Sequence, residues 1–205
     1  SHALDQYRPW GTRFEGAVFT NLTQDHLDYH QDFEHYYQAK KRLFTEYKCD
    51  HLIIHCRDEY GLRLAKELQN IGRIPLTVGP GPQFNCSYKN LSAHASGISG
   101  TLEFRAFKGS APLLINVESK LFGQFNIENL AGVVTLGLAC QIAPATIESF
   151  LQKFSGVPGR MEMVTDPLKN PFTVLVDYAH TPDALENALK TVKPLCKNKL
   201  KVVFG

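Results

Sequence analysis

A chain of 205 residues with 43% hydrophobic content can bury a sizeable core, and its length suits one large domain or one domain with part of another. Its formal net charge of +2 is too small, and its basic residues are too scattered, for a surface that binds nucleic acid or a membrane. Small, soluble substrates are therefore favoured.

The cysteines and the start of the chain indicate where the protein works. The 5 cysteines lie far apart and form no Cys-x-x-Cys pair, a pattern typical of reduced thiols in the cytoplasm. The chain has no run of about 18 apolar residues, and its first residues lack the charged and apolar parts of a signal peptide. We therefore expect a cytoplasmic protein. Because the sequence also lacks a starting methionine, we expect it to be part of a longer chain.

The first part of the chain alternates between expected strands and helices. A buried strand is expected at 16–22, a helix at 32–45, a strand at 51–56, a helix at 58–69 and a strand at 74–79. This β-α-β succession favours a parallel sheet.

The pattern changes in the middle of the chain. Short alternating segments between 86 and 117, interrupted by glycine and serine, predict antiparallel strands. A helix rich in small residues is expected at 125–142, with Asn126 available as its cap. A second helix is expected at 143–154, with Pro144 in its first turn.

The last part of the chain predicts a separate unit. Residues 155–171 are rich in glycine, proline and polar residues and predict an interdomain connection. A buried strand at 172–179, a helix at 181–192 with Thr181 as its cap, and a strand at 200–205 follow. Together they predict one βαβ unit that begins a second sheet.

The helix expected at 32–45 carries a lysine on its apolar side. At helical spacing, Lys40 falls on the same stripe as Tyr36 and Phe44. An ammonium group there must snorkel to water, lose its proton or find an anion. If the side chain only extends its ammonium group to water, the lysine has no functional role. A desolvated lysine amine can instead capture carbon dioxide as a carbamate and become a carboxylate-like metal ligand. Both interpretations stay open at this point.

The sequence DHLDYH, residues 25–30, lies between the first expected strand and this helix. It could simply form a polar turn in which Asp25 or Asp28 caps the helix. His26, Asp28 or His30 could instead bind a divalent cation together with a lysine carbamate, because imidazole nitrogen and carbamate oxygen suit such an ion. Open α/β sheets bind ligands beyond the ends of their strands, which is where this sequence lies. Spacing alone does not choose between the two histidines.

The sequence DYAHTPDALE, residues 177–186, lies at the end of a strand and the start of a helix, where ligands often bind. Asp177 could accept a hydrogen bond from a ribose hydroxyl, and His180 could contact a base or sugar. Asp177 and Thr181 could equally only order the turn. In the preceding connection, Arg160 offers a guanidinium suited to phosphate, although an exposed arginine is usually only solvated.

Six motifs resemble those of the Mur ligase family, within it the MurE type, and they occur in the family's order from the first residue to the last. They are SHALDQYR, VFTNLTQDHLDYH, HYYQAKKRLF, FNIENLAG, VPGRMEMV and VDYAHTPDALENAL. The resemblance implies an α/β fold in two parts. Residues 1–160 would be the later part of the central ATPase domain, a parallel sheet with helices plus a small antiparallel sheet, and residues 161–205 would begin a Rossmann-like C-terminal domain.

The resemblance also implies catalytic and substrate-binding residues. Lys40 matches the family's carbamylated lysine, N6-carboxylysine, which holds Mg²⁺ beside the γ-phosphate of ATP, and His26 matches a histidine ligand of that ion. The inward position of Lys40 would then be explained by its acting as an anion. Gln6 and Arg8, with Ser1 at the edge of the motif, match residues that bind the UDP-muramoyl substrate.

Five further positions match the family's nucleotide site. Asn126 and Asn129 match positions near the adenine, and Arg160 matches an arginine that reaches ATP from the domain junction. Asp177 and His180 match ribose and nucleotide contacts of the C-terminal domain.

The implied reaction is ATP-dependent amide formation in peptidoglycan synthesis. ATP phosphorylates the terminal carboxylate of UDP-MurNAc-L-Ala-D-Glu, and the amine of a diamino acid, 2,6-diaminopimelate or L-lysine, attacks the acyl phosphate. The expected partners are these three molecules, with no nucleic acid and no membrane insertion, and we expect a monomer. The family's phosphate loop would lie upstream of Ser1, so this chain alone is expected to be inactive.

Three alternatives stay open from the sequence. Folylpolyglutamate synthase shares the architecture and the lysine carbamate. A metal-dependent amidohydrolase can also use a lysine carbamate, but it would need further metal ligands at the later strand ends, where only Asp177 and His180 are present. A non-catalytic module with a degenerate nucleotide fold would show no response to Mg²⁺.

Overall fold

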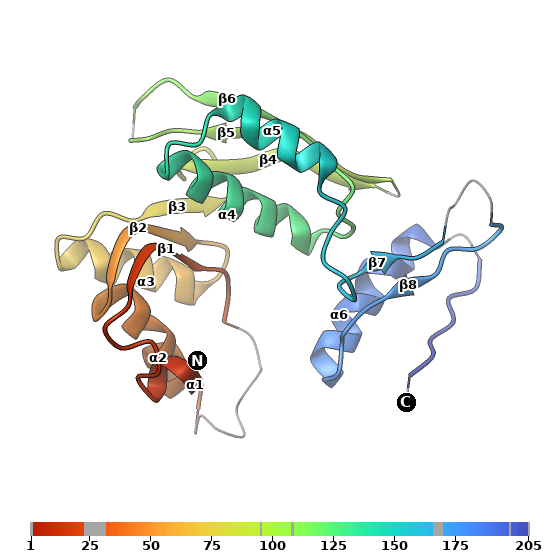
Figure 1. The fold of residues 1–205 in the computed structure, drawn as a ribbon, viewed down its shortest axis with the longest axis horizontal. Helices are drawn as coiled ribbons and strands as arrows, with labels where there is room; N and C mark the ends of the chain where they lie inside the picture. The colour runs from red at the N-terminus through yellow and green to blue at the C-terminus, as the bar shows by residue number, and fades with distance from the viewer. Residues whose placement is uncertain are drawn as a thin grey trace.

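The computed structural model describes residues 2–22, 32–94, 96–107, 109–165, 170–196 and 198–204. The main body is a 6-stranded sheet with helices against it, and a smaller unit made by the C-terminal residues lies beside this body (Figure 1). Ser1 and residues 23–31, which include His26, Asp28 and His30, lie outside the described residues.

The large sheet has the strand order β1-β2-β3-β4-β5-β6. Its strands are β1 (Arg13–Phe19), β2 (Lys48–His55), β3 (Leu76–Gly79), β4 (Cys86–His94), β5 (Gly97–Phe104) and β6 (Leu113–Ser119). β1 to β4 pair in parallel, whereas β4, β5 and β6 pair antiparallel. The expected parallel and antiparallel strands are thus confirmed. The structure adds that β4 joins them, because Val78 of β3 pairs with Cys86 of β4.

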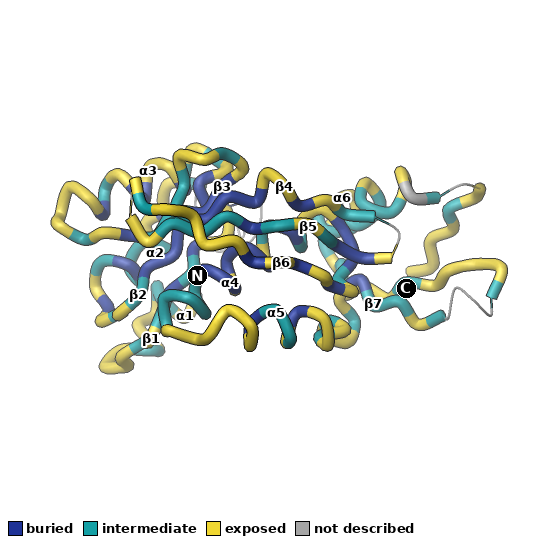
Figure 2. The backbone as a smooth tube through the Cα atoms, turned by 90° about the horizontal axis from the view of Figure 1, so that it is seen from above, coloured by how far each residue is buried: buried dark blue, intermediate teal, exposed yellow. Residues whose placement is uncertain are grey.

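Helices cover the sheet and connect its strands. They are α1 (His2–Asp5), α2 (Phe33–Thr45), α3 (Glu59–Asn70), α4 (Phe125–Ala139) and α5 (Pro144–Lys153). α2 connects β1 to β2 and α3 connects β2 to β3, as the β-α-β pattern predicted. Figure 2 shows the buried residues gathered in the sheet and in the helices against it, whereas the C-terminal unit is largely exposed. Among the described residues, no helix combines the length and hydrophobicity that a membrane crossing requires.

α2 follows the predicted periodicity. Its N-cap is Asp32, whose carboxylate accepts a hydrogen bond of 2.8 Å from the backbone N–H of His35. The side chains of Tyr36, Tyr37 and Phe44 are buried beneath the helix, which confirms its apolar stripe. The opposite side is free to carry charge.

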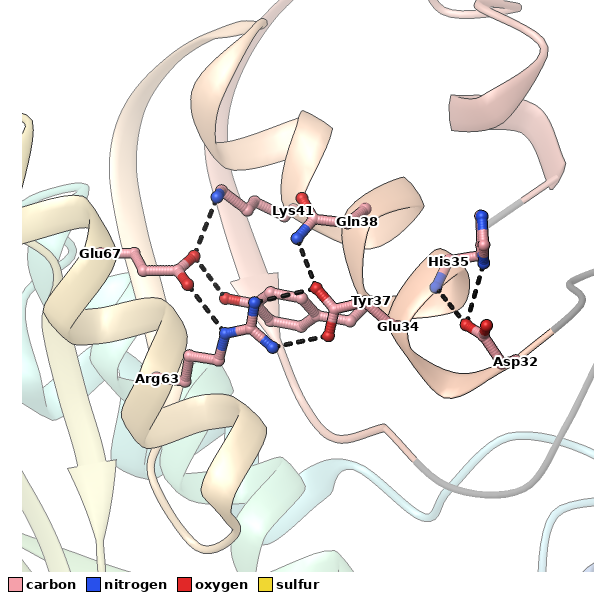
Figure 3. Close-up of polar contacts among 8 residues, drawn as sticks. All are labelled: Asp32, Glu34, His35, Tyr37, Gln38, Lys41, Arg63 and Glu67. Carbon is pink, nitrogen blue, oxygen red and sulfur yellow. Dashed lines mark hydrogen bonds and ion pairs between the residues drawn. The ribbon is translucent and has the colours of Figure 1, made fainter.

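An ion-pair network fastens the outer side of α2 to α3 (Figure 3). Arg63 of α3 donates to Glu34 at 2.7 Å and to Glu67 at 2.8 Å, and Lys41 lies 2.9 Å from Glu67. The Tyr37 hydroxyl donates to Glu67 at 2.8 Å. Burial raises the pKa of Glu67, but the hydrogen bonds from Lys41, Arg63 and Tyr37 outweigh burial and lower it to about 2. Glu67 therefore stays ionised, and α2 is held at a fixed position beside the sheet.

α4 packs closely against a buried side chain of the sheet because it carries a glycine at the contact. A Cβ on Gly132 would lie 2.4 Å from Nε2 of His55, the last residue of β2. His55 is buried, with 2% of its surface exposed, and its Nε2 has no hydrogen-bond partner among the described residues. Burial lowers the pKa of this histidine to about 4. The imidazole is therefore neutral at pH 7, as close packing against the helix requires.

The expected cap of α4 is wrong. The helix begins at Phe125, and its N-cap residue is Gln124, whose side chain makes no capping hydrogen bond. Asn126 already lies in the first turn, where its side-chain amide donates to the carbonyl of Phe122 at 2.7 Å. An asparagine at this position satisfies a carbonyl of the preceding turn rather than an orphan N–H group of the helix.

The C-terminal unit contains β7 (Glu162–Met163), β8 (Leu175–Val176), α6 (Pro182–Val192) and a 3₁₀ turn at Lys193–Leu195. The predicted start of α6 is confirmed, since the Thr181 hydroxyl accepts from the N–H of Ala184 at 3.2 Å. The expected strand at 172–179 is reduced to β8, which pairs only with β7, and Val176 is exposed rather than buried. Residues 200–204 form no strand, and Val203 is 97% exposed. Neither segment has a described neighbour that could bury its apolar residues, so the predicted βαβ unit is incomplete.

We predict that Gly132→Ala lowers the free energy of unfolding by about 1–3 kcal/mol, because the new methyl group collides with the buried His55 ring. Gly137→Ala in the same helix is the matched control. Its Cβ would lie 3.2 Å from the flexible end of Ile147, and alanine gains up to about 1 kcal/mol in helix propensity. Urea denaturation of both variants checks this. Equal effects at the two positions would contradict the close packing of α4 on His55.

We also predict an acid-dependent loss of stability that originates at His55. Above pH 6.5 the ring is neutral in both the folded and the unfolded chain, so it contributes no pH dependence. As the pH falls from 6.5 to about 4, the unfolded chain gains a proton that the folded chain does not, and stability falls by roughly 3 kcal/mol. His55→Leu should flatten this part of the stability profile in urea denaturation. An unchanged slope in the variant would contradict a buried, neutral ring.

Candidate functional site

Lys40 is half-buried and lies at the carboxyl end of β1. Its Nζ donates to the backbone carbonyl of Asn21 at 2.8 Å, and it lies 4.8 Å from the ring centroid of Tyr36 and 5.8 Å from that of Phe19. The expectation that this lysine lies on the apolar side of α2 is therefore confirmed. The amine is held where an open α/β sheet binds its ligands, against Asn21, which precedes His26 by five residues along the chain.

The chain before β1 places Gln6 and Arg8 together. Nε of Arg8 donates to Oε1 of Gln6 at 2.9 Å, and both side chains are exposed. Arg42 of α2 holds this segment in place, because its guanidinium lies 3.3 Å from the Asp5 carboxylate and 4.9 Å from the ring centroid of Tyr7. The two polar side chains are thus presented to solvent from a segment anchored on the same helix as Lys40.

The first turn of α4 brings two amide side chains together. Nδ2 of Asn129 donates to Oδ1 of Asn126 at 3.1 Å. Arg57, which follows β2, lies 2.9 Å from Glu128, so this turn lies at the carboxyl edge of the sheet. Burial raises the pKa of Glu128, and Arg57 acts in the opposite direction. The N-terminus of a helix favours an anion, and here it is flanked by groups that can donate and accept hydrogen bonds.

Asp177 links the residue before β7 to the chain that follows β8. One carboxylate oxygen accepts from the backbone N–H of Met161 at 2.8 Å, and the other accepts from that of Ala179 at 2.9 Å. Just before β7, the N–H of Gly159 donates to Glu162 at 2.8 Å. These contacts agree with the alternative in which Asp177 orders the local backbone. The carboxylate joins Met161 to Ala179, which are far apart in the sequence.

Arg160, Asp177 and His180 meet at one surface. The Arg160 guanidinium lies 4.9 Å from the ring centroid of Tyr178, and the His180 ring centroid lies 5.0 Å from it on an exposed surface. The structure therefore gathers three residues that the sequence singled out. It also adds Tyr178, which contacts both Arg160 and His180 and was not predicted from the sequence. The sequence feature that could have indicated it is an aromatic residue between Asp177 and His180.

The candidate residues fall into separate groups. Figures 1 and 2 show α2, which carries Lys40, and α6, which follows His180, at different ends of the molecule. The first turn of α4 lies between them in contact with the C-terminal unit, since a Cβ on Gly123 would lie 2.6 Å from the side chain of Thr191. The described candidate residues thus form separate polar groups rather than a single enclosed pocket.

Two family models match the chain. The Mur ligase middle domain matches residues 1–137, and the Mur ligase, glutamate ligase domain matches residues 159–205. Both matches agree with the fold described above and with the change of architecture near residue 160.

Several relatives that align with the whole chain carry the same enzyme name. The chain is 41% identical over 206 residues to the UDP-N-acetylmuramoyl-L-alanyl-D-glutamate--2,6-diaminopimelate ligase of Thermosynechococcus vestitus, and 42% identical over 205 residues to that of Aquifex aeolicus. These alignments cover 100% of this chain but only 40% and 39% of the relatives. A solved structure of a ligase with this name matches with a TM-score of 0.75 at 33% identity, over 94% of this chain and 38% of its own. The chain therefore spans about two fifths of the relatives' length.

Proposed function

Because the chain belongs to the Mur ligase family, we propose that it is the central part of an ATP-dependent ligase that adds 2,6-diaminopimelate to UDP-MurNAc-L-Ala-D-Glu. The names of the two relatives support this substrate over L-lysine, and over the reaction of folylpolyglutamate synthase. In this proposal residues 1–160 belong to the ATPase domain and residues 161–205 begin the C-terminal domain. The enzyme works in the cytoplasm as a monomer, and this part alone is inactive because it spans only two fifths of the relatives.

The observation that carries the proposal is the position of the Lys40 amine. It lies at the carboxyl end of β1, half-buried beside Tyr36 and within 2.8 Å of the Asn21 carbonyl. An amine partly removed from water is a better nucleophile toward carbon dioxide than a solvated ammonium. Carbamylation replaces the positive charge by a negative one and gives this edge of the sheet a carboxylate-like ligand.

Ligases of this family use ATP and Mg²⁺. The donor set fits that ion only if Lys40 is carbamylated, because the ammonium has no lone pair to offer and the carbamate oxygen is a hard ligand. His26, which we propose as a second ligand, follows Asn21 by five residues. When bound, Mg²⁺ would offset negative charge on the phosphates during transfer.

We propose that ATP binds between these separate polar groups. Asn126 and Asn129, at the N-terminus of α4, would contact the base, and the helix dipole would favour the nearby negative charge. Arg160 would reach a phosphate, because its guanidinium is presented on the exposed face of Tyr178. Asp177 and His180 would contact the ribose once the two domains close. Gln6 and Arg8, with Ser1, would bind the UDP-muramoyl part from the segment anchored on α2.

The reaction proceeds in two steps in this proposal. A carboxylate oxygen of the substrate attacks the γ-phosphorus of ATP. The bond between this phosphorus and the oxygen that bridges to the β-phosphate breaks, so that ADP leaves and an acyl phosphate is formed. The amine of diaminopimelate then attacks the acyl carbon, a proton is lost from its nitrogen, and phosphate leaves as the amide forms. Both steps need aligned reactants and stabilisation of the negative charge on phosphate and carboxylate oxygens. In this proposal Arg160 and the amides of Asn126 and Asn129 contribute to both.

The carbamate makes a direct prediction for ¹³C NMR. The 205-residue chain, incubated with ¹³C-bicarbonate at mildly alkaline pH, should show a carbamate carbon signal that Lys40→Arg removes. Lys41→Arg is the matched control, since Lys41 is the next residue but pairs with Glu67 on the outer side of α2. A signal that survives Lys40→Arg, or no signal in the unchanged chain, would overturn the carbamate.

The activity is tested in a segment-swapped ligase. The 205 residues replace the corresponding part of the Aquifex aeolicus relative, with which they align over their whole length. Phosphate release with UDP-MurNAc-L-Ala-D-Glu, ATP and diaminopimelate should be retained, and Lys40→Ala should reduce it at least about 100-fold.

Lys41→Ala in the same protein should stay within a few-fold of the parent rate, because its ion pair with Glu67 only fastens α2 to α3. A folded but inactive swap, or equal losses for the two lysines, would contradict the proposed function.

A further inference from the structure

Three side chains that commonly bind metals meet away from the candidate site. They are Glu15 of β1, His51 of β2 and Cys140, the C-cap residue of α4, and their ligand atoms all lie within 4.8 Å of one another. The structure gives none of these side chains a hydrogen bond or ion pair with another described residue. The neighbouring Asp50, by contrast, is fully engaged by Arg13 at 2.9 Å. The three groups are thus left facing one another.

The packing of α4 explains why they meet. A Cβ on Gly16 of β1 would lie 2.4 Å from Cδ1 of Leu136, so the glycine lets the last turns of α4 approach the strand backbone. Gly16 pairs with His51 in the parallel register of β1 and β2. Cys140 ends the same helix, and the thiol therefore arrives beside both strands. Three separate elements each contribute one ligand, and close helix packing fixes their separation.

The donor set has a definite chemical preference. Thiolate, imidazole and carboxylate together suit Zn²⁺, which takes three protein ligands with water in a fourth, tetrahedral position. Ligand atoms around such an ion lie about 3.5 Å apart, so the observed spacing needs only small side-chain movements. Burial, and then the charge of Glu15, raises the pKa of the Cys140 thiol. The thiol therefore keeps its proton until a metal displaces it.

The cluster has an entry path from solvent. Glu15 is exposed, and His51 and Cys140 are only partly buried. His51 also lines a cavity of about 550 Å³. An ion can thus reach the imidazole and the carboxylate without unfolding of the sheet.

We propose that Glu15, His51 and Cys140 form a zinc-binding site that fastens the C-terminal end of α4 to β1 and β2. The site is distinct from the Lys40 site, because Phe19, which contacts Lys40, follows Glu15 by four positions along β1, or about 13 Å. It lies toward the amino ends of the strands, whereas Lys40 lies beyond their carboxyl ends. The inference is therefore independent of the proposed ligase activity.

Co²⁺ is the probe for this site, because thiolate ligation gives it a charge-transfer absorption that Mg²⁺ binding does not produce. The 205-residue chain should bind one equivalent of Co²⁺ with this band, and Zn²⁺ but not excess Mg²⁺ should displace it. Cys140→Ser should remove the band, and His51→Gln and Glu15→Gln should each weaken binding at least tenfold. Zn²⁺ should also raise the thermal unfolding midpoint of the unchanged chain but not that of Cys140→Ser.

Cys49→Ser is the matched control, since Cys49 is another half-buried free cysteine of β2 but is not among the three ligands. Circular dichroism checks that each variant is folded, and if Cys140→Ser is not, the His51 and Glu15 variants decide. No charge-transfer band, a band that persists in folded Cys140→Ser, or loss of the band in Cys49→Ser would overturn the site.

Discussion

The structure depends on the close packing of α4 against the backbone of β1 and the buried His55 side chain of β2. Two glycines make it possible, because Gly16 lets Leu136 approach β1 and Gly132 lets the helix lie against His55 of β2. A side chain at either position would push the helix outward, since the surrounding core has no free space for it. The contact orients the whole helix, so both of its ends are fixed by the same packing. The first turn of α4 reaches the carboxyl edge of the sheet, and its last turn reaches the amino edge.

The two edges have different chemistry for that reason. At the carboxyl edge, the amides of Asn126 and Asn129 and the helix dipole lie on the same side as the Lys40 amine, which suits a nucleotide and its counter-ion. At the amino edge, Cys140 joins Glu15 and His51 in a set of softer ligands. α4 is about 22 Å long, so an ion bound at one edge does not share ligands with the other. One helix thus connects the edge where we propose that Mg²⁺ binds with the edge where we propose that zinc binds.

The sequence predicted what local periodicity controls. The helical stripe of α2 placed Lys40 on the apolar side, and the β-α-β succession predicted the parallel strands, because both follow from alternation of apolar residues within single elements. The contacts of Tyr178 with Arg160, and the meeting of Glu15 with Cys140, could not be predicted, since they join residues that only the folded chain brings together. The strand expected at 200–205 is absent from its described residues, 200–204. An apolar segment forms a strand only where a neighbouring strand can pair with it. The identity of the second metal ligand, His26, stays a prediction.

We propose that the carboxyl edge beside Lys40 binds the nucleotide and its metal ion. A crystal structure of the segment-swapped ligase, grown with bicarbonate, Mg²⁺ and a non-hydrolysable ATP analogue, would test this proposal. We expect electron density for a carbamate on Lys40, an ion bound to it, and adenine at the first turn of α4. A bare Lys40 amine still hydrogen-bonded to Asn21, with the nucleotide bound elsewhere, would contradict it.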